Sequence, residues 1–480
     1  TYTEVVHHTA VDNIVAGTID NEPKWYIGLV RRTERTCTDE QGSSKTSTIA
    51  YTYDDWARLA IKTIEPDEAS GSPLRITTAF IYGDYGNISS VTNTGYDGSS
   101  VKNRATTYTY SDALSDIYQV TQINPEGHIE DLIYDWSTGN LLSHSDVNGL
   151  VSDWFYDGLG RKIRENRPDY TYTEWSYSWG TDPVTGRSLY NVMVQEKDSG
   201  GAKISPDTTG YFDIYNRRVF SSTEGFDGNL IYQQTQYDEF GQVVLSSQPY
   251  YYNESNPRQT SYSYDALGRV TLKEAFDTGT TAYEYNSDTG MTTVITNELS
   301  QATSQTYTAR GLISKVVDAV NTTTTYEYDP FGNLDRVVDA AGNIISMTYD
   351  VRGRKTGMTD PDMGTWSYVY DSFDELVSQT DAKSVVVNMV YDDLGRMTLR
   401  STGELNYNWE YDTADYGIGM PAYVYGTGGY REDYTYDDFS RPIGASTIID
   451  STTYEVTTHY DANCSRVSSI EYPSDGTGRF

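Results

Sequence analysis

Cysteine and histidine are scarce in this chain. Its 480 residues include two cysteines, Cys37 and Cys464, which lie far apart in the sequence. Two such residues form neither a disulfide framework nor a metal-binding spacing. The five histidines give no metal site either, because His7 and His8 are adjacent and would point to opposite faces of a strand. The remaining histidines are His128, His144 and His459. We therefore expect no metal and no cofactor.

Positive charge is also in short supply. The chain has 35 Lys and Arg against 69 Asp and Glu, which gives a formal net charge of -34. This balance excludes nucleic acid as a partner, because phosphate binding needs a basic surface. It also argues against anionic membrane surfaces. No stretch approaches the ~18 consecutive apolar residues of a membrane-spanning helix. The simplest interpretation is an acidic, self-repelling surface.

The common catalytic motifs are absent too. The sequence contains neither a Gly-x-Ser-x-Gly elbow nor a phosphate-binding loop. Carboxylate pairs such as Asp437/Asp438 and Asp360/Asp362 are too abundant to be specific. The segment 146–149 loosely resembles a calcium loop, but the twelve-residue spacing fails, and an Asx turn explains it more simply. We predict no catalytic, cofactor-binding or metal-binding residue.

Tyrosine and glycine are abundant, with 45 and 40 copies. Tyr and Thr favour half-buried strands, whereas Gly and Asp favour turns, so the composition predicts a nearly all-β chain. Tyr-Asp pairs occupy 328–329, 349–350, 370–371 and 391–392, a step of 21 residues three times in succession. A fixed period in this range indicates a repeat architecture in which each unit stacks on its neighbours.

The repeated motif is a box of Tyr-Asp followed, in its full form, by Gly-Arg. We predict that it is structural, because a residue present in every unit serves what every unit needs, which is stacking. Tyr should pack on the neighbouring hairpin, Asp should cap the turn, and Arg should pair with a carboxylate or stack on a tyrosine. The predicted structural residues are Tyr53, Asp54, Tyr134, Asp135, Tyr156, Asp157, Gly160, Arg161, Tyr264, Asp265, Gly268, Arg269, Tyr328, Asp329, Gly332, Tyr349, Asp350, Gly353, Arg354, Tyr370, Asp371, Tyr391, Asp392, Gly395, Arg396, Tyr436, Asp437, Arg441, Tyr460 and Asp461.

Each unit has the pattern of a β-hairpin. In residues 324–338, Tyr326 and Tyr328 alternate with smaller or charged residues, so both tyrosines should lie on one face of a strand. The turn follows at 329–332, and the chain returns through 334–338. A second turn at 339–343 leads into the next unit. We expect two strands of about six to eight residues and two turns in each unit.

The chain divides into two parts. Residues 1–48 are an irregular β lead-in, and residues 49–480 are the repeat array, with an irregular insertion at about 168–210 that contains Trp175, Trp179 and Pro183. The chain begins without an initiator Met and stops within the periodic pattern. We therefore expect it to be a piece of a larger protein, truncated at its C-terminus.

The box at this spacing resembles the YD-repeat, or Rhs-repeat, family over residues 50–480. Residues 25–29 also resemble the lead-in to such repeats in toxin-complex B subunits. The resemblance implies antiparallel β-hairpins that form a spiralling ribbon or hollow shell. In relatives the shell encloses a toxic C-terminal domain, and in teneurins a similar shell belongs to a cell-adhesion protein. The aspartate-rich closing motif of toxin-enclosing relatives does not precede Phe480, so neither self-cleavage nor toxicity is assigned to these residues.

We therefore expect a non-enzymatic shell or scaffold segment of a secreted or cell-surface bacterial protein. The resemblance implies, as partners, the remainder of the same polypeptide or a shell-closing protein, with a toxin or effector as cargo. Two alternatives stay open. The first is an adhesive, glycan-binding or filament-forming module with exposed tyrosines. The second is a polysaccharide-active enzyme, whose cleft we would seek at 168–210.

Overall fold

The computed structural model describes residues 29–39, 42–111, 117–182, 185–252, 254, 257–285 and 291–473, and the backbone alone at 3–8, 16–19 and 22–25. Every regular element in these ranges is a β-strand, and 39 of their strands form one sheet, while β2 and β3 pair separately. The predicted all-β fold of repeated antiparallel hairpins is confirmed. Most of the lead-in motif at 25–29 lies outside the described residues.

The chain separates into two units by its internal contacts. Unit 1 comprises residues 1–151, 326–459 and 468–480, and unit 2 comprises residues 152–325 and 460–467. The predicted boundary near residue 48 stays a prediction, although β4 and β5 on its two sides already pair in the sheet. No helix long and apolar enough to cross a membrane occurs in the part of the chain that the structure describes.

The strands of unit 1 are β1 (Thr3–His8), β2 (Ala16–Ile19), β3 (Glu22–Trp25), β4 (Arg32–Thr38), β5 (Ser44–Tyr53), β6 (Leu59–Ile64), β7 (Ile76–Tyr82), β8 (Ile88–Tyr96), β9 (Val101–Tyr110), β10 (Gln119–Ile123), β11 (Ile129–Tyr134), β12 (Leu141–Ser145), β29 (Leu334–Val338), β30 (Ile344–Tyr349), β31 (Lys355–Asp360), β32 (Gly364–Tyr370), β33 (Leu376–Thr380), β34 (Val386–Tyr391), β35 (Met397–Ser401), β36 (Asn406–Tyr411), β37 (Pro421–Gly426), β38 (Arg431–Tyr436) and β39 (Pro442–Ile449).

The strands of unit 2 are β14 (Lys162–Asn166), β15 (Tyr172–Thr181), β16 (Ser188–Lys197), β17 (Thr208–Phe212), β18 (Arg218–Glu224), β19 (Leu230–Tyr237), β20 (Val243–Ser247), β21 (Tyr250–Tyr251), β22 (Gln259–Tyr264), β23 (Val270–Glu274), β24 (Thr280–Tyr285), β25 (Thr292–Thr296), β26 (Ala302–Tyr307) and β27 (Ile313–Val317). Four strands include residues of both units: β13 (Val151–Tyr156), β28 (Thr323–Tyr328), β40 (Thr452–Tyr460) and β41 (Val467–Glu471).

Each repeat is a hairpin whose register shifts at the box tyrosine. In β34 and β35, Asn388 pairs with Ser401 and Val390 with Leu399, but Tyr391 pairs with Met397. The same shift occurs at the box tyrosines of β5, β22, β30, β32 and β38, among others. A type I turn followed by a residue with positive φ produces such a bulge in a hairpin. The bulge bends and twists the strand at the same point in each unit.

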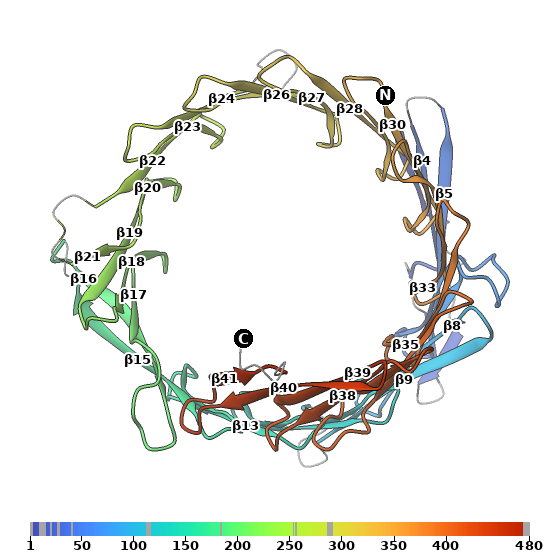
Figure 1. The fold of residues 1–480 in the computed structure, drawn as a ribbon, viewed down its shortest axis with the longest axis horizontal. Helices are drawn as coiled ribbons and strands as arrows, with labels where there is room; N and C mark the ends of the chain where they lie inside the picture. Colours follow the sequence, from blue (N-terminus) through green and yellow to red (C-terminus); the bar gives the residue numbers. More distant parts are fainter. Residues whose placement is uncertain are drawn as a thin grey trace. The chain divides into compact units, whose positions relative to one another are not determined.

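Unit 1 contains two passes of the ribbon. We call residues 29–150 the first pass and residues 326–459 the second pass, drawn blue to cyan and orange to red in Figure 1. Box turns of the second pass contact the first pass near its return turns, which join one hairpin to the next. For example, the amide of Ser372 donates to the carbonyl of Tyr96 at 2.8 Å. Two distant segments of sequence therefore lie side by side.

Unit 2 has its core next to its longest hairpin. Strands β15 and β16 pair over ten positions, from Tyr172 with Lys197 to Thr181 with Ser188. This hairpin lies in the region that we expected to be an insertion, and that interpretation stays a prediction. Beyond it, Phe220, Tyr232 and Tyr250 form a buried aromatic cluster with edge-to-face contacts.

Candidate functional site

The box turn is closed by its aspartate. In the turn that follows β13, Asp157 Oδ1 accepts from the amides of Leu159 and Arg161, at 2.9 and 3.0 Å. Asp157 Oδ2 accepts from the Arg161 side chain at 2.7 Å, and this hydrogen bond lowers the pKa of Asp157. Gly160 completes the turn with a φ of 76°. The same Asp–Arg arrangement recurs at Asp54, Asp213, Asp265, Asp350, Asp392 and Asp437.

The box arginine also reaches the next repeat. Its guanidinium lies over the following tyrosine ring, as Arg396 does over Tyr411 with 4.4 Å to the ring centroid. The equivalent pairs are Arg58 over Tyr82, Arg161 over Tyr177, Arg217 over Tyr237, Arg269 over Tyr285 and Arg354 over Tyr370. Each arginine therefore joins its own turn to the hairpin that comes after it.

The hydroxyl of the box tyrosine forms a hydrogen bond in the opposite direction, to the preceding repeat. The sequence did not predict this bond. Tyr391 Oη donates to the carbonyl of Leu376 at 2.9 Å, at the start of the preceding return strand. The same bond joins Tyr82 to Leu59, Tyr110 to Ile88, Tyr177 to Lys162, Tyr264 to Val243, Tyr285 to Val270, Tyr411 to Met397 and Tyr436 to Pro421. The acceptor is a backbone carbonyl, so no residue type marks it; only its place directly after the preceding box turn could have indicated it.

Some boxes replace the glycine or the arginine and keep the turn. Ala57, Asn216 and Ser440 occupy the glycine position with φ near 60°. Asp135 has no arginine in its turn, and its Oδ1 accepts from the amide and the hydroxyl of Ser137. The box of Asp461, with one extra residue, closes by a hydrogen bond from its amide to the carbonyl of Arg466. The turn therefore tolerates departures from the full motif.

The second pass of unit 1 uses its box turns to bind the first pass. Asp329 accepts from Lys45 Nζ at 2.8 Å, and Arg104 forms two hydrogen bonds with Glu375, at 2.6 and 2.9 Å. These partners are separated by 284 and 271 residues in sequence. Glu375 stands where other boxes carry arginine, so the changed residue serves the contact between passes.

Two phenylalanines at the tips of these turns are covered by first-pass arginines. Arg104 lies over Phe373 with 4.0 Å to the ring centroid, and Arg35 lies over Phe331 at 5.7 Å. Phe373 also approaches the backbone of Gly95, where an added Cβ would lie 3.3 Å from the ring. The contact between passes therefore combines ion pairs with half-buried apolar tips.

Asp371 is the most perturbed carboxyl group of this contact. It is fully buried, and its Oδ1 caps the amides of Phe373 and Glu375, at 2.8 and 2.9 Å. Its Oδ2 is buried without a hydrogen-bond partner. Burial, followed by the neighbouring Glu375 carboxyl group, raises the pKa of Asp371 to about 7. Similarly, burial lowers the pKa of Arg352 in the adjacent box turn.

Residues considered for chemistry have structural partners instead. His144 contacts Glu130 at 3.0 Å and His459 contacts Glu471 at 3.0 Å. Asp146 caps the turn at 146–150, and the neighbouring Asn148 side chain bonds to Ile418 of the second pass. In the described ranges no three His, Cys, Asp or Glu residues are grouped so that they could hold a metal ion.

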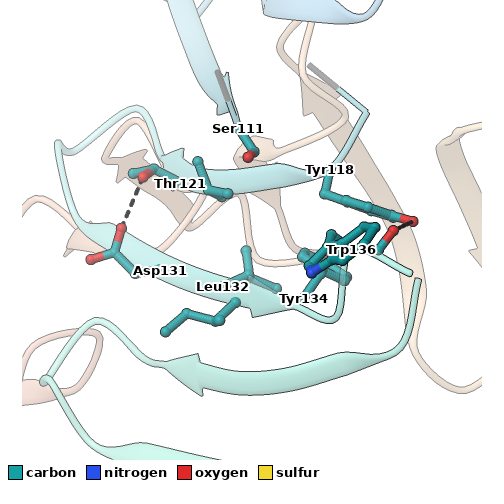
Figure 2. Close-up of a pocket in the computed structure, with 9 residues that line it drawn as sticks. Ser111, Tyr118, Thr121, Asp131, Leu132, Tyr134 and Trp136 are labelled. Atoms are coloured by element: carbon teal, nitrogen blue, oxygen red, sulfur yellow. Dashed lines mark hydrogen bonds between the residues drawn. The ribbon is translucent and has the colours of Figure 1, made fainter. Parts of the chain in front are cut away.

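A small pocket lies at the box of β11. Figure 2 shows Tyr118, Tyr134 and Trp136 around it, and its volume is about 360 Å³. Tyr118 and Tyr134 stack with 5.2 Å between ring centroids, and Trp136 is 69% exposed. Thr121 donates to Asp131 at 2.9 Å on the opposite side of the view. The pocket offers an aromatic wall and one carboxylate.

Comparison with known proteins identifies the repeat. The RHS repeat family model matches residues 307–344 and 328–363. These ranges overlap the stretch with the 21-residue period, and the resemblance to the YD-repeat, or Rhs-repeat, family is confirmed. The comparison with curated proteins finds no relative.

Solved structures with a similar fold are toxin-complex assemblies. The crystal structure of TcdB2-TccC3 has a TM-score of 0.63 and 12% identity, covering 99% of this chain and 35% of that one. TcdB2-TccC3 without its hypervariable C-terminal region gives 0.62 and 12%, covering 99% and 37%. The Tc holotoxin pore of Photorhabdus luminescens gives 0.64 and 11%, covering 99% and 37%. The present chain spans about a third of the length of these chains, and at this identity the likeness concerns the fold.

Proposed function

We propose that residues 1–480 are a non-enzymatic wall segment of an RHS-repeat shell that encloses a polypeptide cargo. The observation that carries this proposal is a set of exposed apolar side chains on the sheet face opposite the box tyrosines. The residue before a box tyrosine lies on that opposite face, because side chains alternate along a strand. In several repeats that residue is large, apolar and exposed: Ile81 60%, Ile133 58%, Phe155 46%, Val369 53% and Val390 49%. Other repeats place a polar residue there, such as Thr52, Ser263 or Glu327.

The exposed apolar side chains on this face are candidates for contact with another molecule. Extended exposed apolar area marks a surface that contacts another molecule. These side chains occur in both passes of unit 1 and in unit 2, so they are not confined to one site. A polypeptide held against it, folded or unfolded, would shield these side chains.

The repeated side chains support a structural rather than a catalytic role. The box aspartates, arginines and tyrosines are joined to one another and to backbone groups of neighbouring repeats. Groups held in this way are not available as general acids, bases or nucleophiles. Secretion or display at the bacterial cell surface, and assembly with a shell-closing polypeptide, are parts of the same proposal that rest on the family resemblance.

Limited proteolysis of the natural protein that contains these residues tests the enclosure. We expect segments outside the RHS repeats to resist protease while the wall is intact. A variant that weakens the wall should make these segments accessible to the protease. Arg104→Met is that variant, because it removes a contact between the two passes. Arg431→Met, which removes an exposed pair with Asp433, is the matched control. Non-repeat segments that are cut equally fast in all three proteins would rule out an enclosed cargo.

A second candidate function is glycan binding at the pocket of Tyr118, Tyr134 and Trp136. An exposed aromatic wall beside a carboxylate can stack on a sugar ring and accept its hydroxyl hydrogen bonds. Binding on a glycan array that Trp136→Ala abolishes and Trp56→Ala preserves would favour it. Trp56 is similarly exposed, at 57%, and serves as the matched control.

A further inference from the structure

The box turn at 329–333 lacks the arginine that closes turns such as that of Asp157. Asn333 stands in its place and donates its side-chain amide to Asp329 Oδ2 at 2.9 Å. The cation comes instead from the first pass, where Lys45 Nζ donates to the same Oδ2 at 2.8 Å. Lys45 Nζ also donates to the carbonyl of Tyr349 at 3.0 Å, which fixes its position. This turn therefore holds a primary amine against a carboxyl group.

The pair of Lys45 and Asp329 is largely shielded from water. The Asp329 side chain is 6% exposed and that of Lys45 is 26% exposed. Lys45 in β5 pairs directly with Cys37 in β4, and Cys37 is fully buried. Directly opposed residues of neighbouring strands have side chains on one face, about 5 Å apart. A buried thiol thus lies beside the lysine stem, and few water molecules compete with the amine at this carboxyl group.

The Asp329 carboxyl group is placed for attack by the amine. Its Oδ1 accepts from the backbone amides of Phe331 and Asn333, both at 2.9 Å. Two N–H groups on one oxygen stabilise the negative charge that forms there when a nucleophile adds to the carbon. Cγ is bonded directly to Oδ2, so a small rotation of the lysine side chain brings Nζ to the ~3–3.5 Å from Cγ at which an amine attacks.

A second carboxyl group, that of Asp335 in β29, supplies a proton carrier. Asp335 is half-buried and close enough to interact electrostatically with both Asp329 and Lys45. Burial, and then the charge of Asp329, raises the pKa of Asp335 above its ordinary value. A carboxyl group that holds its proton more firmly can pass it to a departing oxygen and take another from an ammonium group.

We propose that Lys45 and Asp329 form an intramolecular isopeptide bond, which joins the two passes of unit 1 covalently. Lys45 Nζ attacks Asp329 Cγ, a C–N bond forms and the Cγ–Oδ2 bond breaks. Of the three protons of the ammonium group, one stays on the amide nitrogen and two leave with Oδ2 as water. Asp335 carries protons between the two groups and returns to its initial state, so no oxidant, reductant or co-reactant is consumed. The bond would close residues 45–329 into a covalent ring.

Peptide mapping of the natural protein that contains these residues tests the proposal. The protein is unfolded in guanidinium, digested with trypsin and analysed by tandem mass spectrometry. We expect a linked pair of peptides that contains Lys45 and Asp329 and weighs one water less than the two peptides together. Trypsin should not cut after Lys45, because acylation removes the charge that trypsin recognises. It should cut after Lys203, whose pair with Asp207 at 2.6 Å is more exposed and serves as the internal control.

Three variants separate the bond from an ion pair. Lys45→Arg keeps a cation beside Asp329 but provides no amine, so the linked peptides should disappear. Asp335→Asn keeps the shape of the side chain but cannot carry the proton, so most Lys45 should remain unlinked in freshly made protein. Asp339→Asn, which changes an exposed carboxyl group in the next turn, is the matched control and should link as the parent does.

Three outcomes would overturn the proposal. The first is a parent protein in which the peptides of Lys45 and Asp329 are found unlinked, which would leave an ion pair only. The second is a loss of water confined to a single peptide, as in cyclisation of an aspartate. The third is an Asp335→Asn variant that links as completely as the parent. None of these results depends on an enclosed cargo, since a wall without cargo would carry the same bond.

Discussion

At the scale of single residues, Asp371 differs from the other box aspartates. Asp157 has a partner arginine in its own turn, whereas Asp371 has Glu375 at that position. Burial and this second carboxyl group favour the protonated form of Asp371, because two neighbouring charges in a buried site repel each other. The residue that strengthens the contact between passes therefore makes the adjacent turn sensitive to pH.

Asp371→Asn should stabilise the protein, and by more at about pH 8 than at about pH 5. The pKa of Asp371 in the folded protein, about 7, lies above its ordinary value of 3.8, so its contribution to stability is complete below the ordinary value and is lost as pH rises through about 7. Asparagine keeps the capping oxygen and cannot ionise. Urea unfolding at both pH values measures the effect, which we expect to be on the order of 1–3 kcal/mol at the higher pH.

Asp157→Asn is the control for this titration and has the opposite sign. The arginine hydrogen bond lowers the pKa of Asp157, so its contribution is present above the ordinary pKa and is lost as pH falls through the lowered value. This variant should therefore be less stable than the parent at neutral pH. Equal effects of Asp371→Asn at both pH values would contradict the raised pKa of Asp371.

The tyrosine hydroxyl can be tested separately from its ring. Tyr391→Phe keeps the ring but removes the bond to the carbonyl of Leu376, so we expect a loss of about 1 kcal/mol in the free energy of unfolding. Tyr85→Phe, at a 65% exposed turn position, should change it by less than about 0.5 kcal/mol. Equal losses for the two variants, measured by urea unfolding, would mean that the hydroxyl bond adds nothing.

At the scale of the hairpin, the glycine of the box turn at Gly395 must both adopt a positive φ and leave room for a neighbouring side chain. Gly395 has a φ of 80°, and a Cβ there would lie 2.9 Å from Glu375 Oε1. Arg104 holds that carboxylate in place, so it cannot move freely. Gly342, in a return turn, has a φ of 84° and open space around it. Substitutions at these two glycines therefore distinguish the cost of backbone strain from the cost of steric crowding.

Gly395→Ala should be more destabilising than Gly342→Ala. Both variants bear the cost of a side chain at positive φ, about 1–2 kcal/mol. Only the first also displaces Glu375 from its place beside Arg104. Thermal or urea unfolding of both variants gives the difference. If Gly342→Ala costs as much as Gly395→Ala, the contact at Glu375 plays no part.

The sequence predicts the strands and turns of each hairpin well, but it does not predict the hydrogen bonds that join one hairpin to the next. The 21-residue period and the alternation of Tyr326 and Tyr328 indicate strands and turns, because these depend on neighbours in the sequence. The acceptor of the tyrosine hydroxyl is a backbone carbonyl, which leaves no pattern of residue types. The predicted strands of six to eight residues are also slightly long, since the return strands β33 and β35 have five residues each.

At the scale of the whole molecule, unit 1 is held together by contacts that local patterns do not reveal. The amide of Tyr96 donates to Ser372 across 276 residues of sequence. Which first-pass residue meets which box turn depends on the accumulated geometry of many hairpins. Glu375 in place of arginine was a visible departure from the motif, but the sequence did not indicate its partner, Arg104.

Arg104→Met should loosen the contact between passes. The side chains of Arg104 and Glu375 are each only 11% exposed, so removing the cation leaves a buried carboxylate unpaired, at a cost of about 3–5 kcal/mol. Hydrogen exchange should increase in residues 96–104 and 371–380, whereas β15 and β16 of unit 2 should be unaffected. Arg431→Met, whose pair with Asp433 is exposed, should cost less than about 1 kcal/mol.

The bond from many of the box tyrosine hydroxyls to the preceding repeat has a consequence for synthesis. A hairpin that has just left the ribosome lacks its last hydrogen bond until the next tyrosine follows, 15 residues after the acceptor for Tyr391 and 23 for Tyr82. The ribbon would thus become stable in the direction of synthesis, because a newly made hairpin completes the hydrogen bonds of the previous one. Wherever this bond is made, the last hairpin of the nascent chain would stay without it until the next repeat had been synthesised.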